Sequence, residues 1–212
     1  PAGPATQVVA VDPTTGAFAF TIVAAGSYTI VIDTSSDAAD VTPTPTAGWL
    51  GTEEPDATRS LTVASTDVTE QDFGLFHGSR VEGAVFEDDG AGGGVAGNGI
   101  RDGAEAGIIG AALRAEASGC GGICDSDAST TGGAFVLWIP FAADGQSIAV
   151  IETDAAGFVS TGGSAGTTGG SYALASDTVT FTNAVGSVYT SLEFAAVSGS
   201  SFGPNHQRTA MP

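Results

Sequence analysis

The side chains best suited to chemistry in this 212-residue chain are the carboxylates and amides of residues 86–105, FEDDGAGGGVAGNGIRDGAE. They follow a strand-like run and are separated by glycines, as in a loop. Counted back from Glu105 as position 12, Asp102 falls at position 9, Ile100 at position 7 and Asn98 at position 5. Side-chain oxygens at these positions, with a backbone carbonyl at position 7, are the ligand pattern of an EF-hand-like calcium loop.

The first ligand positions of this loop depart from the pattern. Positions 1 and 3 fall on Gly94 and Ala96, which have no side-chain oxygen. We therefore expect the first ligand to come from Asp88 or Asp89, with residues 90–97 bulging out as an insertion between fixed loop ends. The predicted ligands of one Ca²⁺ ion are Asp88 or Asp89, Asn98, the Ile100 carbonyl, Asp102 and Glu105.

The same segment resembles the opening of the B-type repeats of serine-aspartate repeat surface adhesins, the SdrD B-like domains, which are relatives of the Cna-B modules. The shared pattern is an aromatic-x-Asp strand end, a D-x-N-x-N-G-x-x-D-x-x-E loop and a G-I-x-G continuation. The resemblance implies an extracellular, calcium-stabilised β-sandwich that serves as a spacer. The matching residues are Phe86, Asp88, Asn98, Gly99, Asp102, Glu105, Gly107, Ile108 and Gly110.

Composition indicates an all-β protein. Hydrophobic residues make up 42% of the chain, enough for real cores, and 32 glycines among many Ala, Thr and Ser favour short strands and turns over helices. The length allows one or two domains. We predict tandem Ig-like, Greek-key β-sandwich modules of the Cna-B and SdrD B-like kind.

The charge balance limits the partners. A net charge of -19 argues against nucleic acid and anionic membranes and favours cations. The chain has no lysine, so neither the Lys-Asn isopeptide crosslink found in Cna-B relatives nor lysine-mediated pilin joining can occur within it. The five basic residues are all arginine: Arg59, Arg80, Arg101, Arg114 and Arg208.

The two cysteines, Cys120 and Cys124, lie four positions apart. Half a zinc site is the alternative to a disulfide, but there is no second cysteine pair, and His77 and His206 are remote in sequence. In a secreted context we predict a disulfide that closes a hairpin tip. No signal peptide and no apolar run of transmembrane length is present, which fits a processed chain or an internal segment.

An internal repeat organises the chain. TTGAFAFTIVAAGSYTIVIDTSSDAA at Thr14 parallels TTGGAFVLWIPFAADGQSIAVIETDAAG at Thr130, a period of about 116 residues. Alternating apolar residues predict strands in the first copy around residues 18–22, 28–32, 61–63 and 68–75. The second copy adds a strand at 80–86, the calcium loop and a strand at 108–117.

The repeat predicts three segments. Residues 1–78 form an incomplete module that lacks its first strands, residues 79–198 form a complete module, and residues 199–212 begin a next module or act as a donor strand. Three sources could complete the first module: upstream chain, a smaller rearranged sandwich, or a strand from a neighbouring molecule. The expected partners are other copies of the chain or neighbouring modules, and the adhesive target stays open.

Other functional interpretations have less support. Gly92, Gly94 and Gly97 satisfy G-x-G-x-x-G, but a dinucleotide site requires βαβ units that the sequence does not offer. A Ser-His-Asp triad would depend on His77 or His206, which we interpret as linker histidines. The other paired carboxylates indicate little in so acidic a chain. One pair, beside the cysteines, is interpreted either as part of a second cation site or as turn residues. These carboxylates are Glu53 and Glu54, and Asp125 and Asp127.

Trp49 and Trp138 keep a carbohydrate-binding module open as the alternative function. Trp138 alternates with Phe135, Leu137 and Ile139, so it should point to the opposite face of its strand. We predict instead a non-enzymatic, calcium-stabilised spacer of a secreted bacterial surface adhesin or extracellular filament, with head-to-tail assembly by strand donation as one option.

Overall fold

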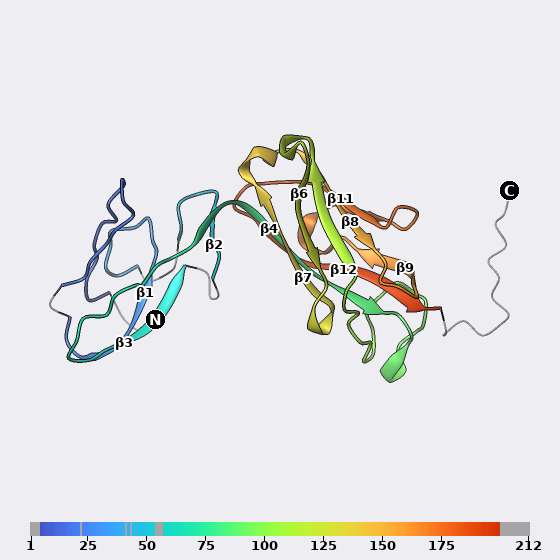
Figure 1. Ribbon diagram of the computed structural model, residues 1–212, viewed down its shortest axis with the longest axis horizontal. Coiled ribbons are helices and arrows are strands. Elements are labelled where there is room, and N and C mark those ends of the chain that lie inside the picture. The colour runs from blue at the N-terminus through green and yellow to red at the C-terminus, as the bar shows by residue number, and fades with distance from the viewer. Residues whose placement is uncertain (1–4, 22, 41, 43, 54–56, 200–212) are drawn as a thin grey trace. The chain divides into compact units, whose positions relative to one another are not determined.

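The computed structural model describes residues 5–199 apart from positions 22, 41, 43 and 54–56 (Figure 1). It contains two compact units, which divide between His77 and Gly78. The described residues form strands and short 3-10 helices but no α-helix, which confirms the all-β prediction and removes the dinucleotide-binding interpretation. None of the described helices is long and apolar enough to span a membrane.

The first unit contains little regular structure. Its two-stranded antiparallel sheet joins β1 (Gly26–Val31) to β3 (Thr58–Val63), with Gly26 opposite Val63. The short strand β2 (Trp49–Gly51) pairs antiparallel with the first residues of β4 (Leu75–Glu87). Asp12 accepts backbone N–H groups of Thr14 and Thr15 through Oδ1, which shapes the turn at the start of the repeat.

Two of the predicted strands in this unit are wrong. Residues 18–21 and 66–73 are not in strands. The Phe18 ring instead packs against Phe20 and Phe73, with centroids 6.0 and 6.2 Å apart, and the Arg59 guanidinium lies over the Phe73 ring. The alternating apolar residues therefore form a cluster of side chains without a hydrogen-bonded strand pair.

The second unit is a sandwich of two sheets. One sheet is antiparallel in the order β10-β11-β8-β5-β6. The other has the order β7-β4-β12-β9, in which β4 and β12 run parallel and the outer pairs are antiparallel. The strands of this unit besides β4 are β5 (Ala112–Ala117), β6 (Gly122–Ala128), β7 (Ala134–Pro140), β8 (Ser147–Thr153), β9 (Phe158–Ser164), β10 (Ser171–Ala173), β11 (Thr178–Thr182) and β12 (Val188–Ser198).

Alternation along these strands builds one core between the sheets. In β7, Phe135, Leu137 and Ile139 are buried. Strand β12 of the same sheet and strands β5, β8 and β11 of the facing sheet also contribute buried residues to this core. Each fully buried aliphatic or aromatic side chain contributes roughly 1.5–3 kcal/mol relative to exposure. The largest fully buried apolar side chains are Phe86, Phe194, Leu113, Leu137, Ile139, Ile148, Leu192, Val81, Val85, Val150 and Val179.

Short 3-10 helices and glycine turns set the strand ends. The predicted strand at 108–117 begins only at Ala112, because Gly110 turns the chain with a φ of 87°. The connection from β4 to β5 carries the predicted calcium loop. The 3-10 helices are η1 (Ala91–Gly93), η2 (Ser118–Cys120), η3 (Thr131–Gly133), η4 (Phe141–Ala143) and η5 (Gly166–Thr168).

Candidate functional site

The predicted calcium loop leaves the end of β4 and returns to the same place. Glu87 N–H donates to the Ala106 carbonyl over 2.8 Å, and Ile108 N–H donates to the Val85 carbonyl over 2.9 Å. These two bonds clamp the loop ends beside each other. The chain between them leaves the sheet as a loop that is folded mainly by its own polar groups.

Asp88 is the centre of this loop. Its side chain is fully buried and accepts four hydrogen bonds. Oδ1 accepts the N–H groups of Gly97 and Asn98, and Oδ2 accepts Gly99 N–H over 2.7 Å and the Thr161 hydroxyl over 2.7 Å. A carboxylate offers about four lone-pair sites, so Asp88 uses all of them to fold the glycine-rich excursion back on itself.

Glu105 and Asp102 are held in the same way. Glu105, which is 5% exposed, accepts Gly90 N–H at Oε1 and Asp102 N–H at Oε2, each over 3.0 Å. Asp102 accepts Val95 N–H at Oδ1 over 2.9 Å and the Asn98 amide at Oδ2 over 3.0 Å. Each of these four carboxylate oxygens accepts one such bond, which leaves lone pairs for a cation.

The remaining predicted ligands lie in the same loop. Asp89 Oδ1 accepts Ala91 N–H over 2.9 Å, and Asn98 Oδ1 accepts Ile100 N–H over 2.8 Å. The Ile100 side chain is 62% exposed. All six predicted residues thus belong to one hydrogen-bonded loop, although its acids do not bring three carboxylates within 4.8 Å of one another, as a different described cluster does.

The loop is fastened to two strands of the sandwich. Asp88 N–H donates to the Ala196 carbonyl of β12 over 2.9 Å, and the Thr161 hydroxyl bond joins it to β9. Gly99 meets Gly162 of β9 so closely that a Cβ on Gly99 would lie 2.8 Å from the Gly162 Cα. A change in the loop is therefore transmitted directly to β9 and β12.

Glu193 of β12 is electrostatically coupled to the loop. Burial raises the pKa of its carboxyl, Arg101 opposes this rise, and the Glu105 carboxylate adds to it. The Arg101 guanidinium also lies over the Phe86 ring, 5.8 Å from the centroid. The acidic loop and Glu193 thus concentrate negative charge that a single arginine partly offsets.

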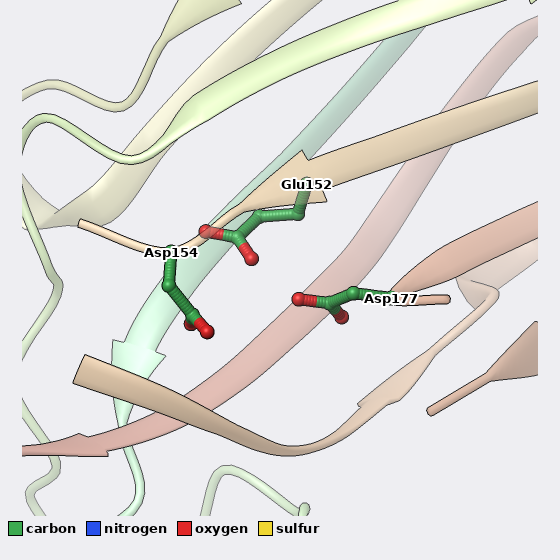
Figure 2. Close-up of side chains that lie close together, drawn as sticks. All are labelled: Glu152, Asp154 and Asp177. Carbon is green, nitrogen blue, oxygen red and sulfur yellow. The ribbon is translucent and has the colours of Figure 1, made fainter. Parts of the chain in front are cut away.

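A second acidic cluster, which was not predicted from the sequence, is formed by Glu152, Asp154 and Asp177. One carboxylate oxygen of each lies within 4.8 Å of the others, and Figure 2 shows the three side chains converging. Burial raises the pKa of Glu152 far above its usual range, and Asp177 and Asp154 raise it further. Among the described residues, no other group of three or more acidic, histidine or cysteine side chains is this close.

Tyr172 of β10 belongs to this cluster as well. Its hydroxyl donates to Asp177 Oδ1 over 2.6 Å, and burial followed by this bond raises the pKa of the phenol. A sequence signal for the cluster existed in the Glu-Thr-Asp end of one strand and the Asp directly before another. It could be used only by knowing that these two strands pair.

The predicted disulfide is confirmed. Cys120 at the end of η2 and Cys124 in β6 are bonded, with Cα atoms 5.0 Å apart. The bridge closes the tip of the hairpin between β5 and β6, where Ala117 lies opposite Gly122. The zinc alternative for these cysteines is therefore wrong.

Asp125 and Asp127 are strand residues of β6, not turn residues, and each binds the neighbouring sheet. Asp125 Oδ2 accepts Trp138 N–H over 2.8 Å, and Asp127 Oδ2 accepts Val136 N–H over 2.9 Å. Their other oxygens accept N–H groups within β6. These aspartates satisfy the outer edge of β7, a role that explains their position without a cation.

Each tryptophan ring packs against another side chain. Trp138 points to the outer face of β7 as predicted, and the Arg80 guanidinium lies over its ring, 5.4 Å from the centroid. Within the first unit, Trp49 stacks on His77 with centroids 4.6 Å apart and planes 7° apart. One face of each ring is thus covered within the chain.

The remaining predicted residues have local roles or lie outside the described part. Glu53 forms a salt bridge with Arg59. Glu54 and His206 lie outside the described residues, as does the tail after Gly199.

Comparisons with known proteins find a similarity in structure but not in sequence family. The sequence matches no protein-family description and no curated protein. Among solved structures, the chain is similar to a minor pilin of the Gram-positive pathogen Streptococcus agalactiae, with 8% sequence identity and a TM-score of 0.34. The similarity covers 73% of this chain and 68% of the pilin chain.

Proposed function

We propose that residues 79–198 are a non-catalytic structural module of a secreted surface adhesin or extracellular filament, stabilised by Ca²⁺ in the loop of residues 88–105. The observation that carries the proposal is that the four carboxylate oxygens of Asp102 and Glu105 each accept one hydrogen bond and keep lone pairs for a cation. The buried Asp88 fastens this loop to Thr161 of β9. A cation held by this loop would stiffen the junction of β4, β9 and β12. Its role would be structural, and it would not shape a cleft for substrate.

The donor set suits a hard cation. Ca²⁺ takes 6–8 oxygen ligands, and this loop supplies carboxylate, amide and carbonyl oxygens without nitrogen or sulfur donors. Asp88 already accepts four hydrogen bonds, so Asp89 is better placed to give the first ligand. Asn98, the Ile100 carbonyl, Asp102 and Glu105 complete the protein ligands.

Electrostatics and redox chemistry agree with an extracellular setting. The net charge of -19 favours cation binding, and the loop itself contributes the carboxylates of Asp88, Asp89, Asp102 and Glu105. The bond between Cys120 and Cys124 suits an oxidising compartment outside the cytosol. A calcium-rich exterior would also keep such a site filled.

Thermal unfolding with calcium and with chelator tests the calcium proposal. Saturation at a hundredfold excess over Kd should stabilise the fold by about 2.7 kcal/mol. Glu105→Gln should remove most of the stabilisation that calcium in the loop provides. The substitution replaces one oxygen of a buried candidate ligand by an NH2 group and removes its charge. Glu116→Gln is the matched control, since Glu116 pairs with Arg114 on β5 away from the loop.

The calcium proposal has a clear contrary result. Unfolding midpoints that are equal in calcium and chelator, with no metal in elemental analysis, would rule it out. A calcium effect that survives unchanged in Glu105→Gln would place the ion elsewhere.

We further propose head-to-tail association through the first unit. Its large apolar side chains are only half-buried within the chain, which favours a partner that covers them. Val197 and Ser198 are not free to donate, because they belong to β12 and Val197 is 4% exposed. The half-buried residues are Phe18, Phe20, Tyr28, Ile30, Ile32 and Phe73.

Deleting residues 200–212 tests donation by the tail, which lies outside the described residues. Light scattering over a concentration series should give growing assemblies for the full chain and a monomer for the truncated chain. Donation by this tail is wrong if both chains are well-folded monomers.

A further inference from the structure

The cluster of Glu152, Asp154 and Asp177 sits where the ends of two paired strands meet. Thr178 of β11 lies opposite Ile151 of β8, and Glu152 N–H donates to the Asp177 carbonyl over 3.1 Å. Glu152 is the sixth residue of β8, and Asp154 follows the strand directly. Backbone pairing therefore fixes the spacing of the three carboxylates.

Two carboxylate oxygens in this cluster are buried without a hydrogen-bond donor. They are Glu152 Oε1 and Asp154 Oδ1. The Glu152 side chain is more than nine-tenths buried, with 5% of the residue exposed. Buried carboxylate oxygens are normally paired with donors, charges or metal ions, because removing them from water alone is costly.

The other oxygens are held firmly by neighbouring strands. Ser160 of β9 donates its N–H and its hydroxyl toward Asp154 Oδ2, each over 3.1 Å. The same hydroxyl lies 2.6 Å from Asp177 Oδ2, while Tyr172 donates to Asp177 Oδ1. These contacts orient Asp154 and Asp177, whose carboxylates lie close to that of Glu152 (Figure 2).

The cluster has no positively charged partner within the part of the chain that the structure describes. Among the described residues, no arginine or histidine forms an ion pair with Glu152, Asp154 or Asp177. Asp177 also adopts a left-handed backbone conformation with a φ of 48°, which is unfavourable for a non-glycine residue. The fold thus holds three acids together without a counter-charge from the described residues.

We propose that Glu152, Asp154 and Asp177 bind one divalent cation, and that this cation is Ca²⁺. An all-oxygen set of three carboxylates matches its preference, and the absence of nitrogen and sulfur donors argues against zinc. The two unpaired oxygens become ligands, and the ion supplies the missing counter-charge. Water molecules complete the coordination.

This ion would join the two sheets of the sandwich. Glu152 and Asp177 belong to the sheet with β8 and β11, whereas Ser160, which holds both aspartates, belongs to β9 of the other sheet. The site lies apart from the loop of residues 88–105 in sequence and in ligands. It does not require that loop to bind calcium.

Calcium stoichiometry of the full chain, measured by equilibrium dialysis and titration calorimetry, tests the site. Glu152→Gln and Asp154→Asn should each lose one bound ion, or bind it at least tenfold more weakly. Glu105→Gln should keep this ion, which separates it from the loop, and Glu116→Gln should match the wild type. Circular dichroism in chelator establishes that each variant is folded.

Terbium luminescence adds a local readout. Tyr172 hydrogen-bonds Asp177, so Tyr172→Phe should reduce tyrosine-sensitised emission from terbium bound here, and Glu105→Gln should not. If Glu152→Gln does not fold, the half-buried Asp154→Asn carries the test. Unchanged stoichiometry and affinity in both acid variants would overturn the site, and binding of Mg²⁺ without Ca²⁺ would overturn its assignment.

Discussion

Glu152 N–H donates to the Asp177 carbonyl over 3.1 Å, one residue beyond the pair of Ile151 with Thr178 that ends the β8–β11 ladder. The pairing holds the two acidic side chains next to each other. Because their separation is set by the backbone ladder, the side chains cannot move far apart to relieve repulsion. The acids must share a proton or a cation, and this choice controls how stability depends on pH and calcium.

We predict that the calcium-free protein loses stability as pH rises, and that Glu152→Gln reduces this loss. Burial is the main cause that raises the pKa of Glu152 in the folded state above its ordinary 4.5, and the neighbouring Asp177 and Asp154 raise it further. The Tyr172 hydroxyl also faces the cluster. The folded state therefore binds more protons than the unfolded state, so the contribution is complete below pH 4.5 and falls as pH rises toward the folded pKa.

Urea unfolding in chelator, from about pH 5 to about pH 9, checks whether the free energy of unfolding falls as pH rises. Glu116→Gln serves as the control, since Glu116 is half-exposed and paired with Arg114. Parallel pH profiles for Glu152→Gln and the wild type would contradict the prediction.

Gly99→Ala should destabilise the second unit more than Gly97→Ala does. Both glycines have left-handed φ angles, 72° and 73°, so each substitution carries strain of about 1–3 kcal/mol. Only Gly99 would also place a Cβ against the Gly162 backbone of β9, whereas Gly97 has open space. Equilibrium urea unfolding gives both values, and equal losses would show that the loop does not press on β9.

Asp127→Ala should weaken the edge of β7. The substitution removes the acceptor of an exposed hydrogen bond from Val136 N–H, at a cost of about 0.5–1.5 kcal/mol. Asp127→Asn keeps a side-chain oxygen and should cost less. Amide hydrogen exchange at Val136 is the local measurement, and equal protection in the wild type and the alanine variant would contradict the assigned role.

Replacing Cys120 and Cys124 together by serine should lower stability only modestly. The bridge closes a very short loop, for which the chain-entropy relation gives about 2 kcal/mol. The tip has other support, because Gln146 Oε1 accepts the Ser118 hydroxyl and Gly119 N–H, each over 2.7 Å. In urea unfolding, the reduced and the doubly substituted proteins should agree with each other and be less stable than the oxidised protein by about 2 kcal/mol. Failure of the serine variant to fold would show that the hairpin depends on the bond.

The sequence alone determined the properties that depend on nearby residues. Alternating apolar positions predicted the inward face of β7 and the outward Trp138, since side chains alternate across a strand. Two cysteines four positions apart, with no other cysteine, predicted the disulfide. The acidic, glycine-rich run predicted a single polar loop at residues 88–105, because short-range spacing brings its donors and acceptors together.

Only the tertiary structure decided which distant segments meet. Phe18 and Phe20 have strand-like spacing, yet no ladder forms at that position, because apolar alternation specifies a face and not a partner. Asp125 and Asp127 bind β7 of the other sheet, which no local pattern indicates. Glu152 and Asp177 become neighbours only because β8 pairs with β11 across the intervening β9 and β10, so register between non-consecutive strands placed the second acidic site.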